Sequence, residues 1–540
     1  MNINKSTPQN PAHISPNNTA QNLILLTVLL AVFVVPSSIS GTAIALEFIA
    51  RSFGDFSQTT QIAQNSNQNQ ALLQWVVNSF NLCFATFTLI WGALADRFGT
   101  RKCLILGVFL YLIGSALSAL SPNLITLDIA RGIAGLGGAS VFACGASILV
   151  KSFSEDKRAK VFALFGTTAG LGITLSPTIS GLLIDAFANA SIAGFAISIE
   201  NSWRSIFAFH FLVLFVVLLL SPVLPKDTQN QESRAQKNAQ NTEQDSMQEA
   251  HKTPQNPTNS EFKVQNKRFD ALGSTLFVAF LCSFMLFITR ISEIASPLTL
   301  GILSFSIIAF ITFALYEKHL HEAGKLPLLD FSNLSNAHFV GFSLVCVVAG
   351  FSFAVLLTYF PAFLQSAFGF SASHSGLFML FLTAPMLFCP IIAGKILAHA
   401  KSKNTPKILS LAMSLMMGAG LLALIVIMRY VGEASEIVGF GLVALVLFVI
   451  GVGMGLHAGA IDNLALSSVG ASKSGFAAGV LNCFRLGSEA VGVAVYGALM
   501  ALFMQIFHNM FSAFSYTLTI LGIFCLILTA LIWRLLAHRN

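Results

Sequence analysis

The chain has 540 residues, of which 55% are hydrophobic and only 10% are charged, and its mean hydropathy is +0.75. Soluble domains carry about 25% charged residues, so this composition excludes an ordinary soluble protein and places most of the chain in a lipid bilayer. The net charge of +7 does not require a nucleic acid partner, because basic residues accumulate in the cytoplasmic loops of membrane proteins.

Fourteen apolar runs follow one another along the chain, each near the roughly 20 residues that a helix needs to cross the hydrocarbon. They predict membrane helices at 22–48, 71–95, 103–121, 124–150, 160–186, 205–222, 269–289, 297–316, 338–360, 373–398, 407–428, 437–461, 475–503 and 514–536. The predicted fold is therefore an all-α polytopic membrane protein. An even number of spans places both termini on the same side.

Lys and Arg residues are distributed unequally between the two sides of the predicted membrane. Most lie in the terminal tails and in the loops on the side of the N-terminus. The opposite side holds four of them, namely Arg51, Arg204, Arg290 and Arg429. Because positive loops stay inside, both termini are predicted to be cytoplasmic, in a multi-pass protein of the cytoplasmic (inner) membrane.

Polar segments divide the chain into predicted regions. The segment 51–70, rich in Gln and Asn, predicts an external loop. The remaining regions are a disordered cytoplasmic tail at 1–21, an N-terminal six-helix bundle at 22–222, a cytoplasmic linker at 223–268, two inserted transmembrane helices at 269–317, a cytoplasmic loop at 318–337 and a C-terminal six-helix bundle with a short cytoplasmic tail at 338–540. The linker has too few apolar residues to form a core of its own.

The stretch GALADRFGTRK, at 92–102, separates the second and third runs. Gly92 and Gly99 predict a tight turn between two helices. Asp96 is predicted to face the positive N-terminus of a neighbouring helix. The basic residues that would hold the turn on the cytoplasmic side are Arg97, Arg101 and Lys102.

This stretch resembles the cytoplasmic signature of the major facilitator superfamily. Further stretches resemble motifs of its fourteen-helix drug:proton antiporter family, namely LDIARGIAGLGGA (Leu127–Ala139, with Arg131 followed by Gly135), LSPTISG (Leu175–Gly181), SWRSIFAFH (Ser202–His210), FDALG (Phe269–Gly273) and SGFAAGVLNCFRLGSE (Ser474–Glu489). The resemblance implies two six-helix bundles of major facilitator type plus two extra helices. It also implies proton-coupled export of hydrophobic or amphipathic drug-like compounds, with Pro177, Gly181 and the 92–102 stretch in conformational gating.

The chain departs from that family at two positions that concern charge. The family usually carries an aspartate midway along the first helix, where this chain has Ser38. Conversely, Glu489 stands where the family more often has glycine or another small residue. The usual titratable position is therefore missing, and another one is present.

Ionisable groups inside the membrane are costly and therefore serve as functional hypotheses. Glu489, the carboxylate placed deepest in the hydrocarbon, is predicted to be the main proton carrier, and Asp128 is the runner-up. Helical spacing predicts that Arg485 pairs with Glu489 and that Arg131 pairs with Asp128. Purely structural ion pairs are the alternative for both.

The resemblance also implies that spans 1, 4, 9 and 12 line a central substrate cavity. The predicted lining residues are Ser38, Arg131, Tyr359 and His457. His457 has the alternative of a neutral, hydrogen-bonded imidazole. The carboxylates near helix ends are predicted to be solvated or capping, namely Glu47 and Asp185 outside and Asp462 inside.

No motif of an enzyme or of an ATP-driven pump occurs, and the eight cysteines lack the spacing of disulfides or metal ligands. We therefore expect no cofactor and an ion gradient as the source of energy. The expected partners are a small-molecule substrate, protons and lipid, with a periplasmic adaptor and an outer-membrane channel if the cell has two membranes. The alternatives are an exporter of one metabolite or siderophore, an importer, or a sensor or scaffold without transport.

Overall fold

The structure is a computed structural model. It describes residues 18–53, 62–188, 191–192, 195–196, 201–227, 270–291, 294, 296–323, 336–400, 402, 404–430, 436–469 and 474–537. Each of the fourteen predicted runs falls on one long helix or on consecutive helical segments. The predicted tail at 1–21 and linker at 223–268 lie mostly outside the described residues.

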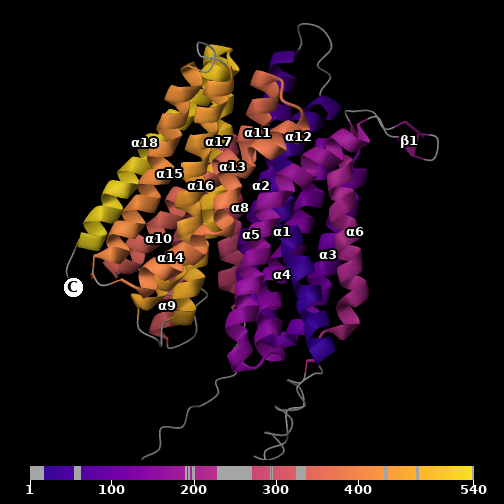
Figure 1. The fold of residues 1–540 in the computed structure, drawn as a ribbon, viewed down its shortest axis with the longest axis vertical. Helices are drawn as coiled ribbons and strands as arrows, with labels where there is room; N and C mark the ends of the chain where they lie inside the picture. Colours follow the sequence, from indigo (N-terminus) through magenta and orange to yellow (C-terminus); the bar gives the residue numbers. More distant parts are fainter. Residues whose placement is uncertain are drawn as a thin grey trace, which may run out of the picture.

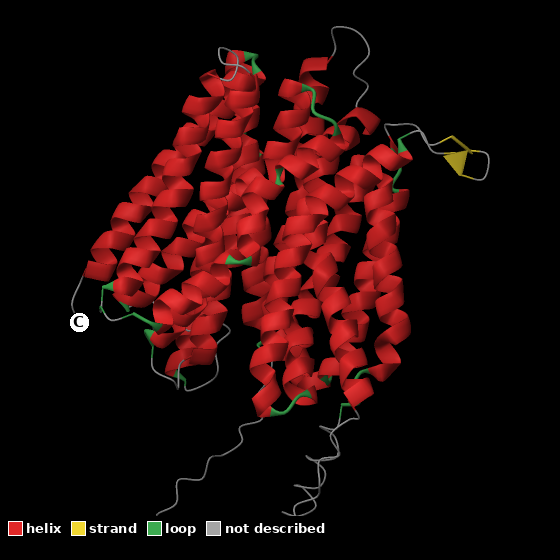
Figure 2. Ribbon diagram, viewed as in Figure 1, coloured by secondary structure: helices red, strands yellow, loops and turns green. Residues whose placement is uncertain are grey.

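The first half of the chain forms six long helices. They are α1 (Asn18–Phe53), α2 (Ile62–Phe98), α3 (Thr100–Leu120), α4 (Leu124–Ser152), α5 (Glu155–Phe187) and α6 (Arg204–Leu220), which ends in the 3₁₀ turn η2 (Ser221–Val223). Between α5 and α6, β1 (Ser191–Ile192) and β2 (Phe195–Ala196) form a small antiparallel hairpin, drawn in yellow in Figure 2. The hairpin lies beside the helical bundle and leaves the all-α class unchanged.

The second half begins with the pair α8 (Ala271–Thr289) and α9 (Pro297–Glu322). Two spans are then built from several segments: α10 (Ala337–Ala349), the π-helical turn η5 (Gly350–Ala354) and α11 (Val355–Phe368), followed by α12 (Ala372–Phe378), α13 (Leu380–Thr383), the 3₁₀ turn η6 (Ala384–Leu387) and α14 (Cys389–Ala398). The last four helices are α15 (Thr405–Tyr430), α16 (Glu436–Ser467), α17 (Ser474–Phe507) and α18 (Met510–Ala537).

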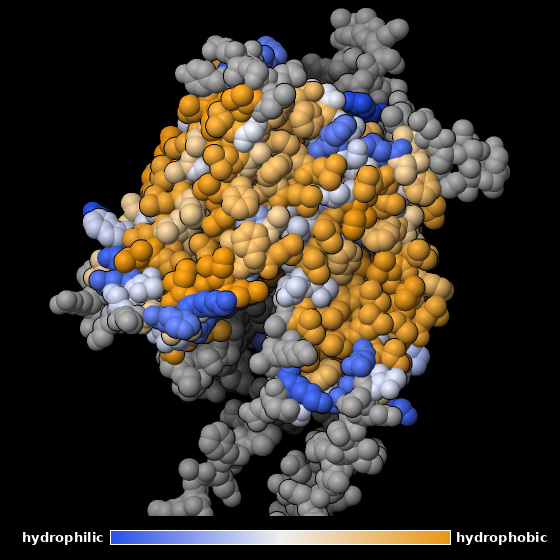
Figure 3. All heavy atoms as spheres, in the orientation of Figure 1, coloured by the Kyte–Doolittle hydropathy of each residue, from blue (hydrophilic) through white to orange (hydrophobic). Residues whose placement is uncertain are grey.

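The outer surface of the helices is apolar, as lipid contact requires. Among the described residues, thirteen helical stretches are long and apolar enough to cross a membrane, and α2 adds a helix of 37 residues. Large side chains such as Leu120, Ile308 and Ile527 are exposed on these helices. Figure 3 shows hydrophobic residues over most of the visible face, with hydrophilic ones near its upper and lower ends. The chain is a multi-pass membrane protein.

Two predicted connections between helices differ in the structure. The predicted external loop at 51–70 is partly helical, because α1 ends at Phe53 and α2 already begins at Ile62. Hydropathy locates the hydrocarbon but not the polar turns by which a helix extends beyond it. Gly92 lies inside α2, where an added Cβ would meet nothing within 4 Å, and so it makes no turn. The turn rests on Gly99 alone, whose φ of 103° suits glycine.

The helices form two neighbouring bundles, α1–α6 and α10–α18, which Figure 1 shows side by side in indigo to magenta and in orange to yellow. The pair α8 and α9 joins them from outside, where α8 packs against α2 and α17. We call the end of the molecule with the Gly99 turn the basic end. The opposite end, with the Gly369 turn between α11 and α12, is the far end.

The two bundles approach each other most closely where α5 meets α12. A Cβ added at Gly181 would lie within 3 Å of the backbone of Ala372 and Ser373. One at Gly376 would likewise collide with the backbone of Pro177. The predicted gating residues Pro177 and Gly181 therefore both lie on the helix face that contacts the other bundle, where only small residues allow such close packing.

Hydrogen bonds between the described parts of the two bundles run from the far end to the middle of the molecule. At the far end, Gln365 Nε2 donates to Ile44 O (3.2 Å), Ser366 Oγ to Glu47 Oε2 (2.7 Å) and the Ser373 backbone N–H to Asp185 Oδ2 (3.0 Å). Farther in, Thr174 Oγ1 donates to Thr383 O (3.0 Å). In Figure 3 the bundles meet in the upper part and are parted in the lower part. This conformation is closed at the far end.

The close contact between α5 and α12 gives a first prediction. Gly181→Ala places a Cβ against backbone that cannot yield easily, and overpacking of this kind costs about 1–3 kcal/mol. We expect a lower melting temperature in detergent. Gly394→Ala in α14 is the matched control, because its added Cβ meets nothing within 4 Å and alanine favours a helix by up to about 1 kcal/mol. Equal melting temperatures for the two variants would contradict the close approach.

Candidate functional site

The first bundle encloses the guanidinium of Arg131, whose residue is only 1% exposed. Its Nη1 donates to Ser38 Oγ (2.6 Å) and its Nη2 to Ser38 O (2.9 Å), both on α1. Its Nε donates to Val76 O on α2 (2.9 Å). The two predicted cavity residues Ser38 and Arg131 are thus in direct contact. Neutral oxygen acceptors therefore take the place of the carboxylate on α1 with which this guanidinium would otherwise form an ion pair.

Aromatic rings cover the faces of this guanidinium. The Arg131 Cζ atom lies 4.5 Å from the ring centre of Phe80 and 5.4 Å from that of Phe207. Such cation–π contacts contribute more when they are shielded from water. Gly135, one turn along α4, allows this geometry, because a Cβ there would collide with the Phe80 backbone. The arginine–glycine spacing therefore brings α4 close enough to α2 for Arg131 to reach Val76.

Asp128 does not pair with Arg131, contrary to the prediction from their spacing. Asp128 is 9% exposed, and neither of its carboxylate oxygens has a hydrogen-bond partner. The guanidinium instead points across to α1 and α2, where its donors are already used. Asp128 is a buried acid with no hydrogen-bond or salt-bridge partner among the described residues, which is a costly state for a carboxylate in a membrane.

A second buried polar network lies beside the first and was not predicted. Ser37 Oγ lies 2.7 Å from Ser176 Oγ on α5 and 3.1 Å from His210 Nε2 on α6. The other ring nitrogen of His210 has no partner, and the residue is 1% exposed. His210 ends the SWRSIFAFH stretch, yet spacing along the chain gives no sign that it meets α1 and α5.

The second bundle carries an ion pair that also differs from the prediction. Arg485 on α17 pairs with Asp462 on α16, not with Glu489 one turn further along its own helix. The Asp462 side chain is 52% exposed, as predicted for a solvated carboxylate, but it also binds a guanidinium. Glu489 is half-buried and has no ion-pair partner among the described residues. Helical spacing indicated a shared face, but the tertiary neighbour bound the arginine.

The π-helical turn η5 lies directly against α17 at Glu489. A Cβ added at Gly350 would touch the backbone of Ser488 and Glu489. Nearby, Ser488 Oγ donates to Cys346 O (3.0 Å), and His457 Nε2 lies 3.4 Å from Cys346 Sγ. His457 is therefore a buried imidazole in contact with a thiol.

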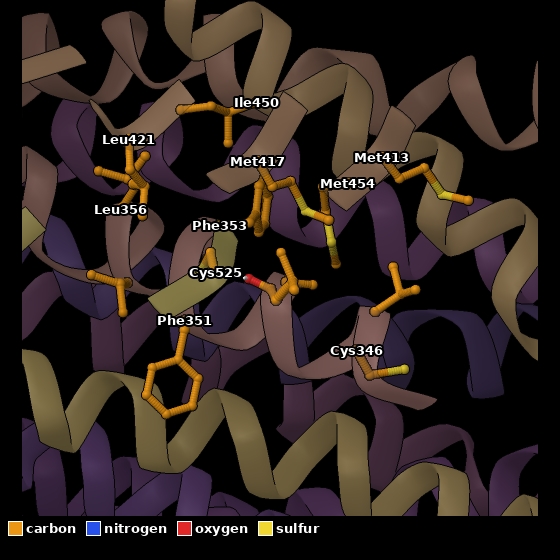
Figure 4. Close-up of a cluster of buried hydrophobic side chains, with 14 of the residues drawn as sticks. Cys346, Phe351, Phe353, Leu356, Met413, Met417, Leu421, Ile450, Met454 and Cys525 are labelled. Atoms are coloured by element: carbon orange, nitrogen blue, oxygen red, sulfur yellow. Dashed lines mark hydrogen bonds between the residues drawn. The ribbon is translucent and has the colours of Figure 1, made fainter. Parts of the chain in front are cut away.

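Figure 4 shows the apolar cluster around this turn, with Phe351 and Phe353 of η5 among side chains from α10, α11, α15, α16 and α18. Dense packing on this side holds the π-helical turn in place. Such turns frequently occur at functional sites.

Tyr359 lines a cavity of about 210 Å³ at the far end, away from the Ser38–Arg131 contact. Its ring stacks on that of Tyr496, with centres 4.4 Å apart, and its hydroxyl has no partner. Glu47 lines the same cavity. The four predicted cavity residues therefore occupy three places, namely Ser38 with Arg131, Tyr359 in the far-end cavity and His457 beside Cys346.

The signature stretch at the basic end is built around Gly99. The Asp227 carboxylate accepts hydrogen bonds from the backbone N–H groups of Arg101 (3.0 Å) and Lys102 (3.3 Å), at the positive N-terminus of α3. A Cβ at Gly99 would collide with this carboxylate. The glycine thus makes room for a cap from the segment after α6, which the sequence analysis missed.

The other residues of the stretch lie at the surface of the basic end. Arg101 Nη2 donates to Pro222 O (3.3 Å), and the guanidinium of Arg97 lies 5.4 Å from the ring centre of Phe98. The Asp96 side chain lies outside what the structure describes, so its contact with a helix N-terminus stays a prediction. In the part of the chain that is described, no group of His, Cys, Asp and Glu residues could hold a metal ion.

Two membrane-embedded helical bundles that close at one end, with unpaired carboxylates inside, define the class of polytopic transporters. Residues 28–493 match the family model described as Major Facilitator Superfamily. The chain belongs to this superfamily, whose members are transporters and not enzymes.

Relatives and solved structures agree with this assignment. The multidrug resistance protein Stp of Mycobacterium tuberculosis (strain CDC 1551 / Oshkosh) is 25% identical over 492 residues, covering 90% of this chain and 77% of the relative. The riboflavin transporter RibZ of Clostridioides difficile (strain 630) is 25% identical over 446 residues, covering 82% of each. The xylose transporter XylE from E. coli, in a partially occluded inward-open conformation, shares the fold with a TM-score of 0.58 at 14% identity. The match covers 95% of this chain and 99% of that one.

The contacts of Arg131 predict how its substitutions behave. Arg131→Ala leaves the oxygens of Ser38 and Val76 without their donor, and hydrogen bonds to a charged group contribute about 1.5–3 kcal/mol each. We expect a marked loss of stability and of transport. Arg131→Lys should recover only part, because an ammonium cannot reproduce the planar fork.

Melting temperature in detergent and dye transport in proteoliposomes measure these effects. Ser38→Ala is the matched control, since it removes one acceptor and leaves the backbone carbonyls bound, so its loss should be smaller. Full transport and an unchanged melting temperature in Arg131→Ala would show that the buried guanidinium is dispensable.

Proposed function

We propose that this protein is a proton-coupled exporter of hydrophobic or amphipathic drug-like compounds across the cytoplasmic membrane. The observation that carries the proposal is Glu489, a half-buried carboxylate inside a membrane helix with no ion-pair partner among the described residues. Similarity to a multidrug resistance protein over 90% of the chain supports the substrate class. The placement of Lys and Arg supports a cytoplasmic basic end, so the far end faces outside.

In this orientation the structure corresponds to a state open toward the cytoplasm. The far-end contacts of Glu47 and Asp185 with α11 and α12 close the outside. Opening outward requires that these contacts break while the bundles approach each other at the basic end. We assign the 92–102 stretch to that second state, in which Asp96 would face the N-terminus of α17, which begins at Ser474.

Glu489 is the proton carrier in this proposal. Because Arg485 is bound to Asp462, the Glu489 carboxylate is not neutralised by a salt bridge and can exchange a proton. Its backbone contacts Gly350 in the π-helical turn of the neighbouring span. A change of charge at Glu489 therefore acts where α17 touches span 9, which consists of α10, η5 and α11, and it can bias the equilibrium between the two states.

Asp128 is the alternative carrier, since it too lacks a partner. It is more enclosed than Glu489, however, since Asp128 is buried and Glu489 is half-buried. The second alternative concerns the transported substrate. The riboflavin transporter has the same 25% identity, over 446 residues rather than 492, so an exporter or importer of one metabolite is the alternative function.

Proton release on substrate binding provides the decisive measurement. Glu489→Gln should abolish the release from detergent-purified protein while a neutral substrate still binds, because the amide keeps the shape but carries no titrating proton. Asp128→Asn is the matched control and should release protons as the unmodified protein does. Normal release from Glu489→Gln would overturn the assignment and leave the carboxylate without a coupling role.

Transport assays in proteoliposomes complete the test. An imposed proton gradient should drive uptake of a lipophilic dye in one direction, and riboflavin in the same assay separates the two substrate classes. Gradient-driven movement of riboflavin but of no dye would replace drug export by the metabolite alternative.

A further inference from the structure

The far-end cavity lies between the two bundles. Its described lining comes from α1 and α2 of the first bundle and from α11, α17 and α18 of the second. A cavity of about 210 Å³ exceeds the roughly 150 Å³ of a protein cavity that holds benzene, so it has room for one aromatic ring. Because both bundles contribute walls, any movement that opens the far end changes this cavity.

The polar lining of the cavity includes acceptors that a ligand could use. Glu47 contributes a carboxylate, and Oε1 of the buried Gln74 has no hydrogen-bond partner. The Tyr359 hydroxyl also has none. The described lining includes no Lys, Arg or His side chain. An unpartnered buried acceptor is costly, and a ligand that donates or carries positive charge would satisfy it.

The rest of the wall is apolar and adaptable. The stacked rings of Tyr359 and Tyr496 form one side, and the flexible thioethers of Met500 and Met504 form another. Methionine side chains adjust to ligands of different shape. Aromatic and thioether walls around a carboxylate suit organic cations, which need an apolar surface as well as a counter-ion.

Arg51 already supplies a cation to this carboxylate. Its Nε and Nη2 atoms each lie 3.2 Å from Glu47 Oε1, and its side chain is 54% exposed. The other carboxylate oxygen accepts from Ser366 Oγ on α11 (2.7 Å), which orients Glu47 across the two bundles. An exposed ion pair of this kind contributes at most about 1 kcal/mol, so a ligand can displace it.

We propose that the far-end cavity binds a small aromatic ammonium ion with Glu47 as its counter-ion, and that Arg51 is a tethered competitor for the same carboxylate. The inference rests on the proposed function and deepens it, since it names the substrate class and places a binding site at the exit. Binding of the cation releases Arg51 to solvent. The bound cation also lies next to the hydrogen bond from Ser366 to Glu47, which links the two bundles at the far end.

Equilibrium dialysis of the full-length protein in lipid nanodiscs, with radiolabelled phenyltrimethylammonium as the probe, tests the site. Glu47→Gln should weaken binding at least tenfold, because it removes the counter-ion. Arg51→Gln should strengthen binding severalfold, because it removes the competitor. The two changes alter charge in opposite directions and therefore predict opposite shifts.

Glu322→Gln on α9 is the matched control. Glu322 also pairs with a basic residue one turn away, Lys318 at 3.9 Å, but it does not line the cavity. Its removal should leave the affinity unchanged. Gel filtration and melting temperature establish that each variant is folded. Unchanged affinity in Glu47→Gln, or equal losses in Glu47→Gln and Glu322→Gln, would overturn the inference.

The same protein separates this inference from the proposed function. Absence of substrate-induced proton release from the unmodified protein, with Glu47-dependent binding intact, would overturn the coupling and leave the site. Proton release with Glu47-independent binding would overturn the site and leave the coupling.

Discussion

The first bundle depends on one positive charge that has no negative partner. Arg131 is compensated by the hydroxyl and carbonyl of Ser38, by the Val76 carbonyl and by two aromatic faces. These groups belong to α1, α2 and α6, so a single side chain on α4 holds four helices together. In hydrocarbon an uncompensated guanidinium is costly, and this cost makes the arrangement of the four helices specific.

The two bundles solve the problem of buried charge differently. In the first, the cation is satisfied by neutral oxygens and the nearby Asp128 stays without a partner. In the second, Arg485 forms an ion pair with Asp462, and Glu489 has no ion-pair partner among the described residues. Each bundle therefore holds a membrane-embedded carboxylate, Asp128 or Glu489, that has no ion-pair partner among the described residues. Between them the contact surface is built from close backbone approaches at glycine and from single carboxylate hydrogen bonds, which can be broken and remade.

The fold was predictable because the thickness of the bilayer fixes the length of each apolar segment. All fourteen predicted segments fall on helices. The site was predictable only in part. Spacing along a helix reveals which residues share a face but not which neighbour lies opposite, and so both proposed ion pairs were wrong. The partners of Arg131, Arg485 and His210 come from other helices, up to 173 residues away for His210 and Ser37. Likewise, the sequence does not reveal that Gly99 makes the turn with a positive φ whereas Gly92 lies inside α2.

The π-helical turn between α10 and α11 has a consequence for how a signal can travel along span 9. This turn spreads one additional residue over its length, and one residue of an α-helix corresponds to a rotation of about 100°. Conversion of Gly350–Ala354 to α-helical geometry would therefore rotate α11 about its own axis relative to α10. Tyr359 would swing away from Tyr496, although nothing at the far end had pushed it. The segment from Gly350 to Phe368 thus links the backbone contact with Glu489 of α17 to the far-end cavity that Tyr359 lines.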